Sequence, residues 1–177
     1  MNVRVVLFVA AAALASVAGA GLSGCGPSAQ VQAARSASYG GADRDVVFEA
    51  AAQAVAAKYE IDQASPSDAA LRTVPEWYEP EGNHERKDAD DHIMIRAGSI
   101  ELAFYVAVVG DQSAWRVEVT PLALQVVQGS PQPRELKPDD PAMPGWVEGK
   151  LDDLRVAIHE RVMSAIGSGA AAPPAAP

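Results

Sequence analysis

Two His-Glu pairs, at positions 84–85 and 159–160, come closest to a catalytic metal motif in this chain. A zinc protease of this type needs a second histidine four residues after the first, so that both imidazoles lie on one face of a helix. Asp88 and Met163 stand at those positions instead. We therefore expect neither pair to bind zinc, and the sequence indicates no other metal or cofactor.

The acidic loop, residues 79–91, is the second place where chemistry could occur. It carries eight charged residues, among them Asp88, Asp90 and Asp91 beside His92. Clustered carboxylates can hold calcium or another hard cation. The glycine turn and the distal glutamate of a known calcium loop are missing, which favours a solvated hairpin tip. Cation binding stays open as the alternative.

Motifs for covalent and nucleotide chemistry are missing from the sequence. A serine nucleophile of the hydrolase type requires Gly-x-Ser-x-Gly between a strand and a helix, and this pattern does not occur. Neither a Walker loop nor a dinucleotide-binding glycine pattern is found. We expect no catalytic residue and no enzyme activity.

Cys25 is the only cysteine of the chain, and a leader of distinctive composition precedes it. Arg4 is followed by a largely apolar stretch from Val5 to about Ala18, which is typical of a secretion signal. Roughly 14 apolar residues are few for a membrane-spanning helix, which needs about 20. A single cysteine cannot form an internal disulfide, so a leftover thiol in a secreted chain needs an explanation.

The residues Leu22-Ser23-Gly24-Cys25 resemble the lipobox of bacterial lipoproteins. In that family the cysteine thiol receives a diacylglyceryl group, a dedicated signal peptidase cuts just before the cysteine, and the new amine is acylated. The resemblance implies a signal peptide over 1–24, cleavage between Gly24 and Cys25, and a lipidated mature chain of 153 residues. Several acyl chains anchor a protein firmly, since each buried CH₂ contributes about 0.8 kcal/mol.

Gly26 follows the cysteine, where aspartate would favour retention in the inner membrane of enteric bacteria. The resemblance therefore implies a lipid anchor in the bacterial cell envelope, at the outer membrane. The residues leave one alternative open, which is an uncleaved N-terminal membrane helix with an incidental cysteine.

The acidic residues are confined to the middle of the chain. Segment 43–166 holds all 23 acidic and 12 of the 14 basic residues, so its formal net charge is −11, against −9 for the whole chain. Nucleic-acid binding needs a basic surface that displaces counterions from the phosphates, and no Lys or Arg cluster is present. We expect one modest folded domain over 43–166 that does not bind nucleic acid.

Two segments of low complexity flank this domain. Residues 25–42 are small, polar and almost uncharged, which predicts a flexible tether that holds the domain roughly 20 Å from the lipid surface. Residues 167–177 are rich in alanine and proline, which predicts a disordered tail.

The apolar periodicity of the domain predicts two helices around a group of strands. Steps of three and four residues predict a helix of about 15 residues after Asp43 or Asp45, and a last helix after Pro144. Between them, alternation predicts antiparallel strands near 59–62, 71–77, 92–97, 99–109 and 115–126. Residues 129–145, with five prolines, predict an irregular crossover. The large apolar residues change sides after Pro121, which predicts a bulge there.

The expected fold is α+β in two layers, with an N-terminal helix, a four- to five-stranded antiparallel sheet and a C-terminal helix. This order, over 43–166, resembles the helix-grip modules of some outer-membrane lipoproteins and implies no functional residue beyond Cys25. With the lipobox, it favours an anchored envelope protein whose domain binds another protein or supports an assembly. The alternatives are a carrier or sensor that holds a small ligand or lipid in a cavity between helix and sheet, and a hydrolase with an unrecognised site.

Aromatic residues indicate where a partner would bind. Trp77 and Tyr78 lie where the second strand meets the acidic loop, and Trp146 lies at the start of the last helix. Trp and Tyr are favoured in protein interfaces, although such residues are more often part of the core. We expect these three residues to border a contact surface, and the acidic residues around them favour a cationic or polar partner.

Overall fold

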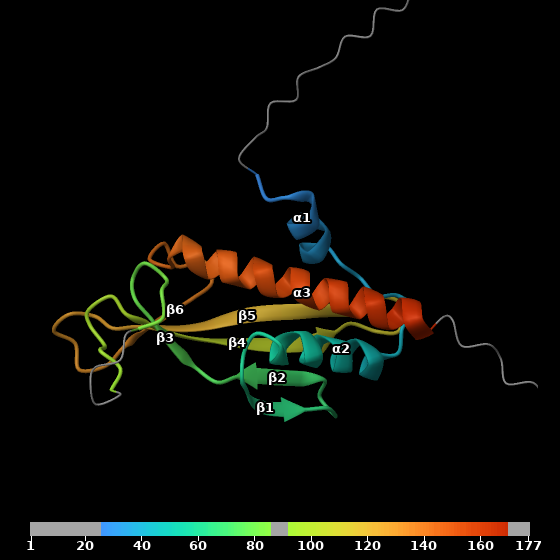
Figure 1. The fold of residues 1–177 in the computed structure, drawn as a ribbon, viewed down its shortest axis with the longest axis horizontal. Helices are drawn as coiled ribbons and strands as arrows, with labels where there is room; N and C mark the ends of the chain where they lie inside the picture. The colour runs from blue at the N-terminus through green and yellow to red at the C-terminus, as the bar shows by residue number, and fades with distance from the viewer. Residues whose placement is uncertain (1–25, 86–91, 170–177) are drawn as a thin grey trace, which may run out of the picture.

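The computed structural model describes residues 26–85 and 92–169 (Figure 1). Its helices are α1 (Ala29–Arg35), α2 (Arg44–Ala56) and α3 (Gly145–Gly169). Its strands are β1 (Ile61–Ser65), β2 (Ala70–Thr73), β3 (Glu76–Tyr78), β4 (Ile100–Val109), β5 (Arg116–Gln125) and β6 (Arg134–Leu136). The leader with Cys25, residues 86–91 of the acidic loop and the tail from 170 lie outside the described residues.

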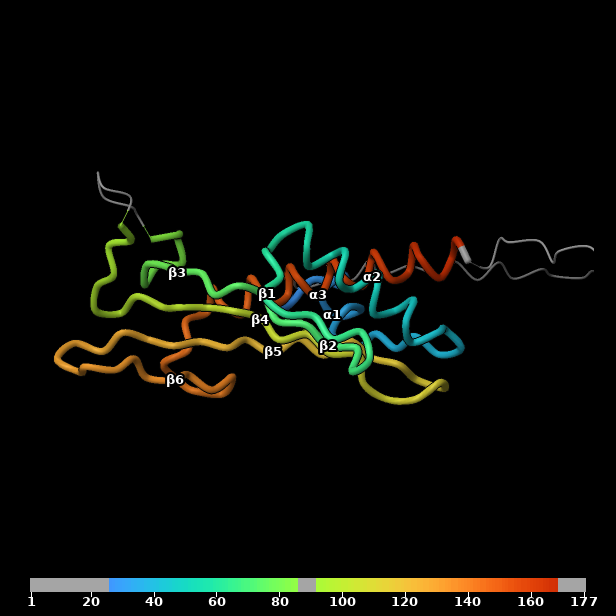
Figure 2. The backbone as a smooth tube through the Cα atoms, turned by 90° about the horizontal axis from the view of Figure 1, so that it is seen from below, coloured from blue at the N-terminus to red at the C-terminus, as the bar shows by residue number. Residues whose placement is uncertain are grey.

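The six strands form one antiparallel sheet in the order β1-β2-β4-β5-β6, and β3 pairs with β4 beyond the end of β2. Figure 1 shows α2 and α3 side by side across one face of this sheet. In Figure 2, β3 and β6 lie at one end of the sheet and the turn between β4 and β5 lies at the other. The predicted two-layer α+β fold is therefore confirmed.

The core lies between the helices and the sheet. Every second residue of β4 faces the helices and is buried, namely Ile100, Leu102, Phe104, Val106 and Val108. α2 adds Val47, Phe48 and Val55, and α3 adds Leu151, Leu154, Ile158 and Val162. Burying one such side chain contributes about 1.5–3 kcal/mol, so this shared interior holds the two layers together.

The two predicted helices begin where the sequence indicated. Asp43 caps α2, because its Oδ1 accepts the backbone N–H of Asp45 at 2.8 Å. α3 begins at Gly145, directly after Pro144, and ends at Gly169, three residues into the segment that was predicted to be a disordered tail. No described helix is both long and apolar enough to cross a bilayer.

Pro121 does not cause the predicted bulge, because β4 and β5 keep one register through the pair Phe104↔Pro121. The carbonyl of Trp115 points away from β4, because it accepts a hydrogen bond from the N–H of Tyr39 at 2.8 Å. In a strand, the backbone polar groups of every second residue point to the same edge, so the nitrogen of Pro121 also points away from β4. Phe104 turns its N–H away from β5, to Thr73 Oγ1 at 2.9 Å. The N–H that proline lacks would therefore point to the edge, so the ladder with β4 loses no hydrogen bond.

Three further strand predictions differ from the structure. The strand expected over 71–77 is divided into β2 and β3, with Pro75 between them. Segment 92–97 forms no strand beyond an isolated bridge residue at Ile93, because β2, β3 and β5 already occupy both edges of β4. β6, in the crossover that was expected to be irregular, was missed because it has only three residues between prolines.

α1 lies in the segment that the sequence predicted to be a flexible tether. Ser28 caps this helix, and Tyr39, after it, is only 4% exposed. The helix packs on α3, as Figure 1 shows. Its partners are more than 110 residues away in the sequence, so composition alone could not reveal them.

Candidate functional site

The face of the sheet opposite α2 and α3 is open among the described residues. In β5, Val119, Pro121 and Ala123 are buried toward the helices, and the residues between them point the other way. Two of these outward residues are large and apolar: Leu122 is 42% exposed and Leu124 is 37% exposed. Neighbouring exposed leucines on one sheet face are a feature of contact sites.

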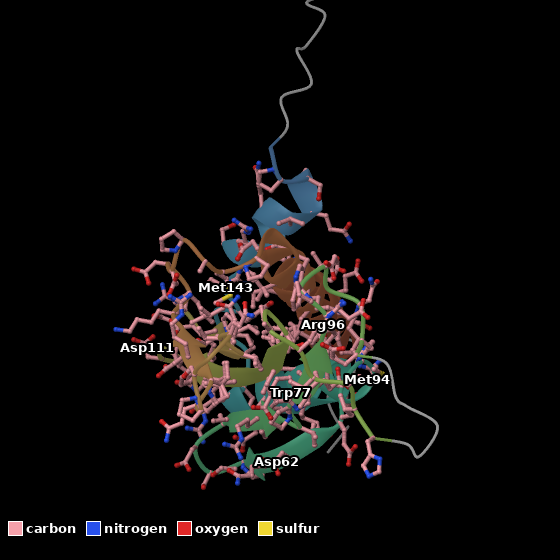
Figure 3. All side chains as sticks on the ribbon, turned by 90° about the vertical axis from the view of Figure 1, so that its left-hand side faces the viewer. Asp62, Trp77, Met94, Arg96, Asp111 and Met143 are labelled. Carbon is pink, nitrogen blue, oxygen red and sulfur yellow. The ribbon has the colours of Figure 1, made fainter. Side chains whose placement is uncertain are left out.

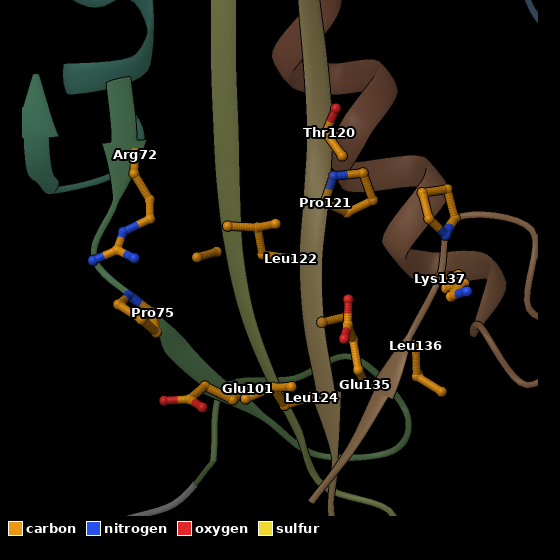
Figure 4. Close-up of a pocket in the computed structure, with 13 residues that line it drawn as sticks. Arg72, Pro75, Glu101, Thr120, Pro121, Leu122, Leu124, Glu135, Leu136 and Lys137 are labelled. Carbon is orange, nitrogen blue, oxygen red and sulfur yellow. The ribbon is translucent and has the colours of Figure 1, made fainter. Parts of the chain in front are cut away.

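A groove of about 370 Å³ runs over these leucines, and we call it the sheet groove (Figure 4). Ala103 of β4 lies opposite Leu122 and contributes to its floor. Figure 4 shows Arg72 and Pro75 on one side of the leucines, and Leu136 with Lys137 on the other. Short β6 therefore forms one wall of the groove, and the end of β2 with the bend before β3 forms the other.

Charged residues of both signs surround the apolar floor. Arg72 is held by an ion pair with Asp62, at 2.5 Å between Nη2 and Oδ2. Glu101 and Glu135 line the groove beside Leu124, and Lys137 stands after β6. An apolar centre with a polar rim is the usual composition of a protein interface.

The structure separates the three aromatic residues that were expected to border one surface. Trp77 pairs with Glu101, so it lies on the open face of the sheet, in the same row as Leu124. Tyr78 points into the core, is 1% exposed, and packs against Trp146 at 5.3 Å between ring centroids. Trp77 thus lies beside the sheet groove, while the other two close the end of the core.

Tyr78 forms the centre of a packed cluster. Its hydroxyl donates to Glu76 Oε2 at 2.5 Å, and burial together with this bond raises the pKa of Tyr78 well above its usual value. The ring of His84 lies 4.6 Å from the tyrosine ring, and Lys150 Nζ lies 4.5 Å from the ring centroid. The Trp146 indole N–H donates to a carbonyl of the loop at 2.9 Å. The hydroxyl stays protonated at neutral pH. Because its contacts are all with other parts of this domain, the cluster stabilises the fold.

The second His-Glu pair is also occupied by local contacts. His159 Nδ1 lies 3.2 Å from the hydroxyl of Tyr39, and burial raises the pKa of Tyr39 to about 12. Glu160 accepts a hydrogen bond from Gln30 at 2.5 Å. Within the described ranges, no group of three or more His, Cys, Asp or Glu residues is arranged to hold a metal ion.

The described part of the acidic loop contacts the chain that follows it. Arg96 lies 3.6 Å from Glu79 and 3.4 Å from Glu81. Glu85 accepts a hydrogen bond from the hydroxyl of Ser99. The aspartates of the loop, at 88, 90 and 91, lie outside the described residues, so the cation interpretation stays a prediction.

No protein-family model matches this chain, and no curated protein matches its sequence. The function is therefore inferred from the lipobox-like residues and from the geometry of the described domain.

Sequence reasoning missed the sheet groove because it explained the change of sides at Leu122 and Leu124 by a bulge at Pro121. One signal could have found them. Arg116, Glu118 and Thr120 have the same parity as the two leucines, and an unbroken strand puts all five on one face. Reading β5 without a bulge would have predicted two leucines beside polar residues on the solvent face.

Proposed function

We propose that this protein is a lipid-anchored bacterial envelope lipoprotein whose domain binds another envelope protein through the sheet groove, without catalysis. The lipid anchor is attached to Cys25, and the protein is localised at the outer membrane. The exposure of Leu122 and Leu124 on a groove with a charged rim is the observation that supports binding. Covering such a patch removes apolar surface from water, which is the main driving force of protein association.

The partner is a protein segment whose chemistry complements this groove. Apolar side chains would cover Leu122 and Leu124, and charged groups of both signs would meet the rim. On the rim, Lys137 would form an ion pair with an acidic group of the partner, and Glu135 with a basic group. The mixed rim fixes the orientation of the partner more than it adds affinity.

The interior supports binding on the outside of the sheet. Phe104, Leu154 and Ile158 are each 2% exposed or less and fill the space between the sheet and α3. A carrier that holds its ligand between helix and sheet would need an apolar cavity there. The sheet groove, in contrast, is open to an incoming chain without any change of the core.

Site-specific photo-crosslinking in cells tests the binding proposal. A benzophenone amino acid at position 137, on the rim, should yield one discrete heavier species that contains an envelope protein. The same probe at Met163, which is 52% exposed on α3, is the matched control and should not yield it. Leu124→Asp should abolish the species from position 137, whereas Val46→Asp on α2 should leave it unchanged. A species that survives Leu124→Asp, or that arises equally from position 163, would contradict the proposal.

Replacing the lipidated cysteine tests the anchor. We expect Cys25→Ser to abolish the incorporation of labelled fatty acid and to leave a precursor that keeps its leader. Ser23→Thr is a mild change at a small lipobox position and should still be labelled. Labelling that persists in Cys25→Ser would contradict the proposed anchor.

A further inference from the structure

The chain between the proposed anchor and the ordered domain is very short. Ser28 caps α1, since its Oγ accepts the N–H of Val31 at 3.3 Å. Only Gly26 and Pro27 separate this cap from Cys25. Three residue steps span at most about 11 Å even when fully extended, so α1 begins within that distance of the acylated residue.

A set of polar contacts, which we call the clasp, holds α1 on α3. Arg35 binds Asp152 with two hydrogen bonds, Nε to Oδ1 at 2.8 Å and Nη2 to Oδ2 at 2.7 Å, and it also contacts Glu148 at 2.5 Å. At the other end of α1, Gln30 donates to Glu160 at 2.5 Å. A two-point arginine–carboxylate pair is strong and directional, so it fixes the position of the helix.

The chain that follows α1 is also fixed to the domain. The N–H of Tyr39 donates to the carbonyl of Trp115 at 2.8 Å, and the N–H of Gly41 donates to the carbonyl of Gln112 at 3.0 Å. The side chain of Tyr39 is buried beside His159. With the clasp closed, residues 28–42 therefore add no free length between the lipid and the domain.

We propose that the clasp holds the domain directly against the bilayer that carries its acyl chains, with α1 as the membrane-facing element. This inference rests on the proposed anchoring at Cys25. Arg35 is the only charged residue of segment 26–42, and its charge is matched by two carboxylates. The exposed residues Gln32 and Ala33 are uncharged. When α1 contacts the lipid headgroups, no unpaired charge of the helix has to be desolvated.

This placement also orients the sheet groove. Figures 1 and 3 show α1 outside α3, and Figure 3 shows Trp77 on the other side of α3 from α1. The groove lies on the face of the sheet opposite the helices. With α1 on the membrane, α3 and the edge of β5 beside α1 lie nearest the lipid, and the groove, on the side of Trp77, lies farther from the bilayer.

Energy transfer from the domain to the lipid surface tests the inference on the full lipidated protein. The protein is reconstituted in phosphatidylethanolamine–phosphatidylglycerol vesicles that contain an acceptor-labelled lipid. A donor dye is placed on a cysteine at one of two exposed positions. Met163→Cys lies on α3, one turn from Glu160, and Lys137→Cys lies at the groove. We expect higher transfer from position 163 than from position 137.

Opening the clasp should remove that difference. In Arg35→Ala, residues 26–38 become a tether, because Tyr39 and Gly41 keep their own hydrogen bonds to the domain. Transfer from position 163 falls, and the two positions become equivalent. α1 contains no buried residue, so this variant should keep the fold, and its thermal unfolding provides the check. Arg44→Ala removes one arginine from α2 instead and should keep the difference.

The outcomes separate the anchor from the inference. If the protein carries no acyl chains and does not float with the vesicles, the proposed anchor fails, and the inference fails with it. If the protein is acylated but both positions transfer equally, the anchor stands and the membrane-facing role of α1 is overturned. Persistence of the difference in Arg35→Ala would overturn the role of the clasp.

Discussion

Gly82 allows the loop after β3 to lie directly on the indole of Trp146. Its φ of +93° is a conformation that residues with a side chain rarely adopt. An added Cβ would lie 2.7 Å from the tryptophan ring, which is too close for any real contact. The end of the core beside Tyr78 therefore depends on one residue without a side chain.

We predict that Gly82→Ala destabilises the domain by more than backbone strain alone. Gly129 is the matched control, because it also has a positive φ (+79°), but no atom lies within 4 Å of an added Cβ. Gly129→Ala should lower the free energy of unfolding by about 1 kcal/mol. Gly82→Ala should cost about 1–3 kcal/mol more, because the indole must move. Urea unfolding measures both, and equal costs would show that the contact with Trp146 contributes nothing.

At the scale of elements, the docking of α1 depends on the ionisation of one carboxyl. The hydrogen bonds from Arg35, with support from Arg155, lower the pKa of Asp152 below its usual value of 3.8. A carboxyl with a lowered pKa favours the docked state at any pH above its free value. That stabilisation is lost as the pH falls through the lowered pKa of the docked state.

We therefore predict that α1 stays docked at neutral pH, and that docking weakens below about pH 4 and is lost as the pH falls through the lowered pKa of Asp152. The amide chemical shifts of Ala29–Arg35, followed by NMR from pH 7 to pH 2.5, report the change. Asp152→Asn should weaken docking already at pH 7 and flatten the titration. Glu148→Gln removes the second carboxylate and should have a smaller effect. A titration that is unchanged in Asp152→Asn would contradict this assignment.

The elements also show which parts of the fold the sequence could predict. α2, α3 and β4 have at least ten residues each, so their periodicity identified them without tertiary information. α1 and β6 have seven and three residues, and their order depends on distant partners such as Asp152 and Ala123. The candidate site was predictable only in part. Trp77, which lies beside the groove, was singled out because it is aromatic, whereas Leu122 and Leu124 were hidden by the assumption that proline must interrupt a ladder.

At the scale of the whole molecule, leucines of the two layers lie in different environments. Leu154 of α3 is fully buried between the layers, whereas Leu122 of β5 is 42% exposed on the open face. The first contributes to folding, and the second is available for binding.

We predict that Leu154→Ala lowers the free energy of unfolding by about 2–5 kcal/mol, as expected for a cavity in a packed core. Leu122→Asp should change it by less than about 1 kcal/mol, because this side chain is 42% exposed and lies outside the core. Urea unfolding of the two variants measures the difference. A large loss of stability in Leu122→Asp would assign this residue to the fold and would weaken the proposed role of the sheet groove.

The position of Pro121 affects how copies of this chain can associate through the outer edge of β5. Among the described residues, β6 covers this edge at Ala123–Gln125 and Tyr39 bridges to Trp115 just before β5, which leaves the middle of the strand without a backbone partner on that side. Such edges recruit strands from neighbouring copies and begin aggregation. Because proline offers no donor on this edge, an added strand would lose a hydrogen bond midway along it. This proline thereby opposes edge-to-edge polymerisation between copies of the chain, at no cost to the chain's own sheet.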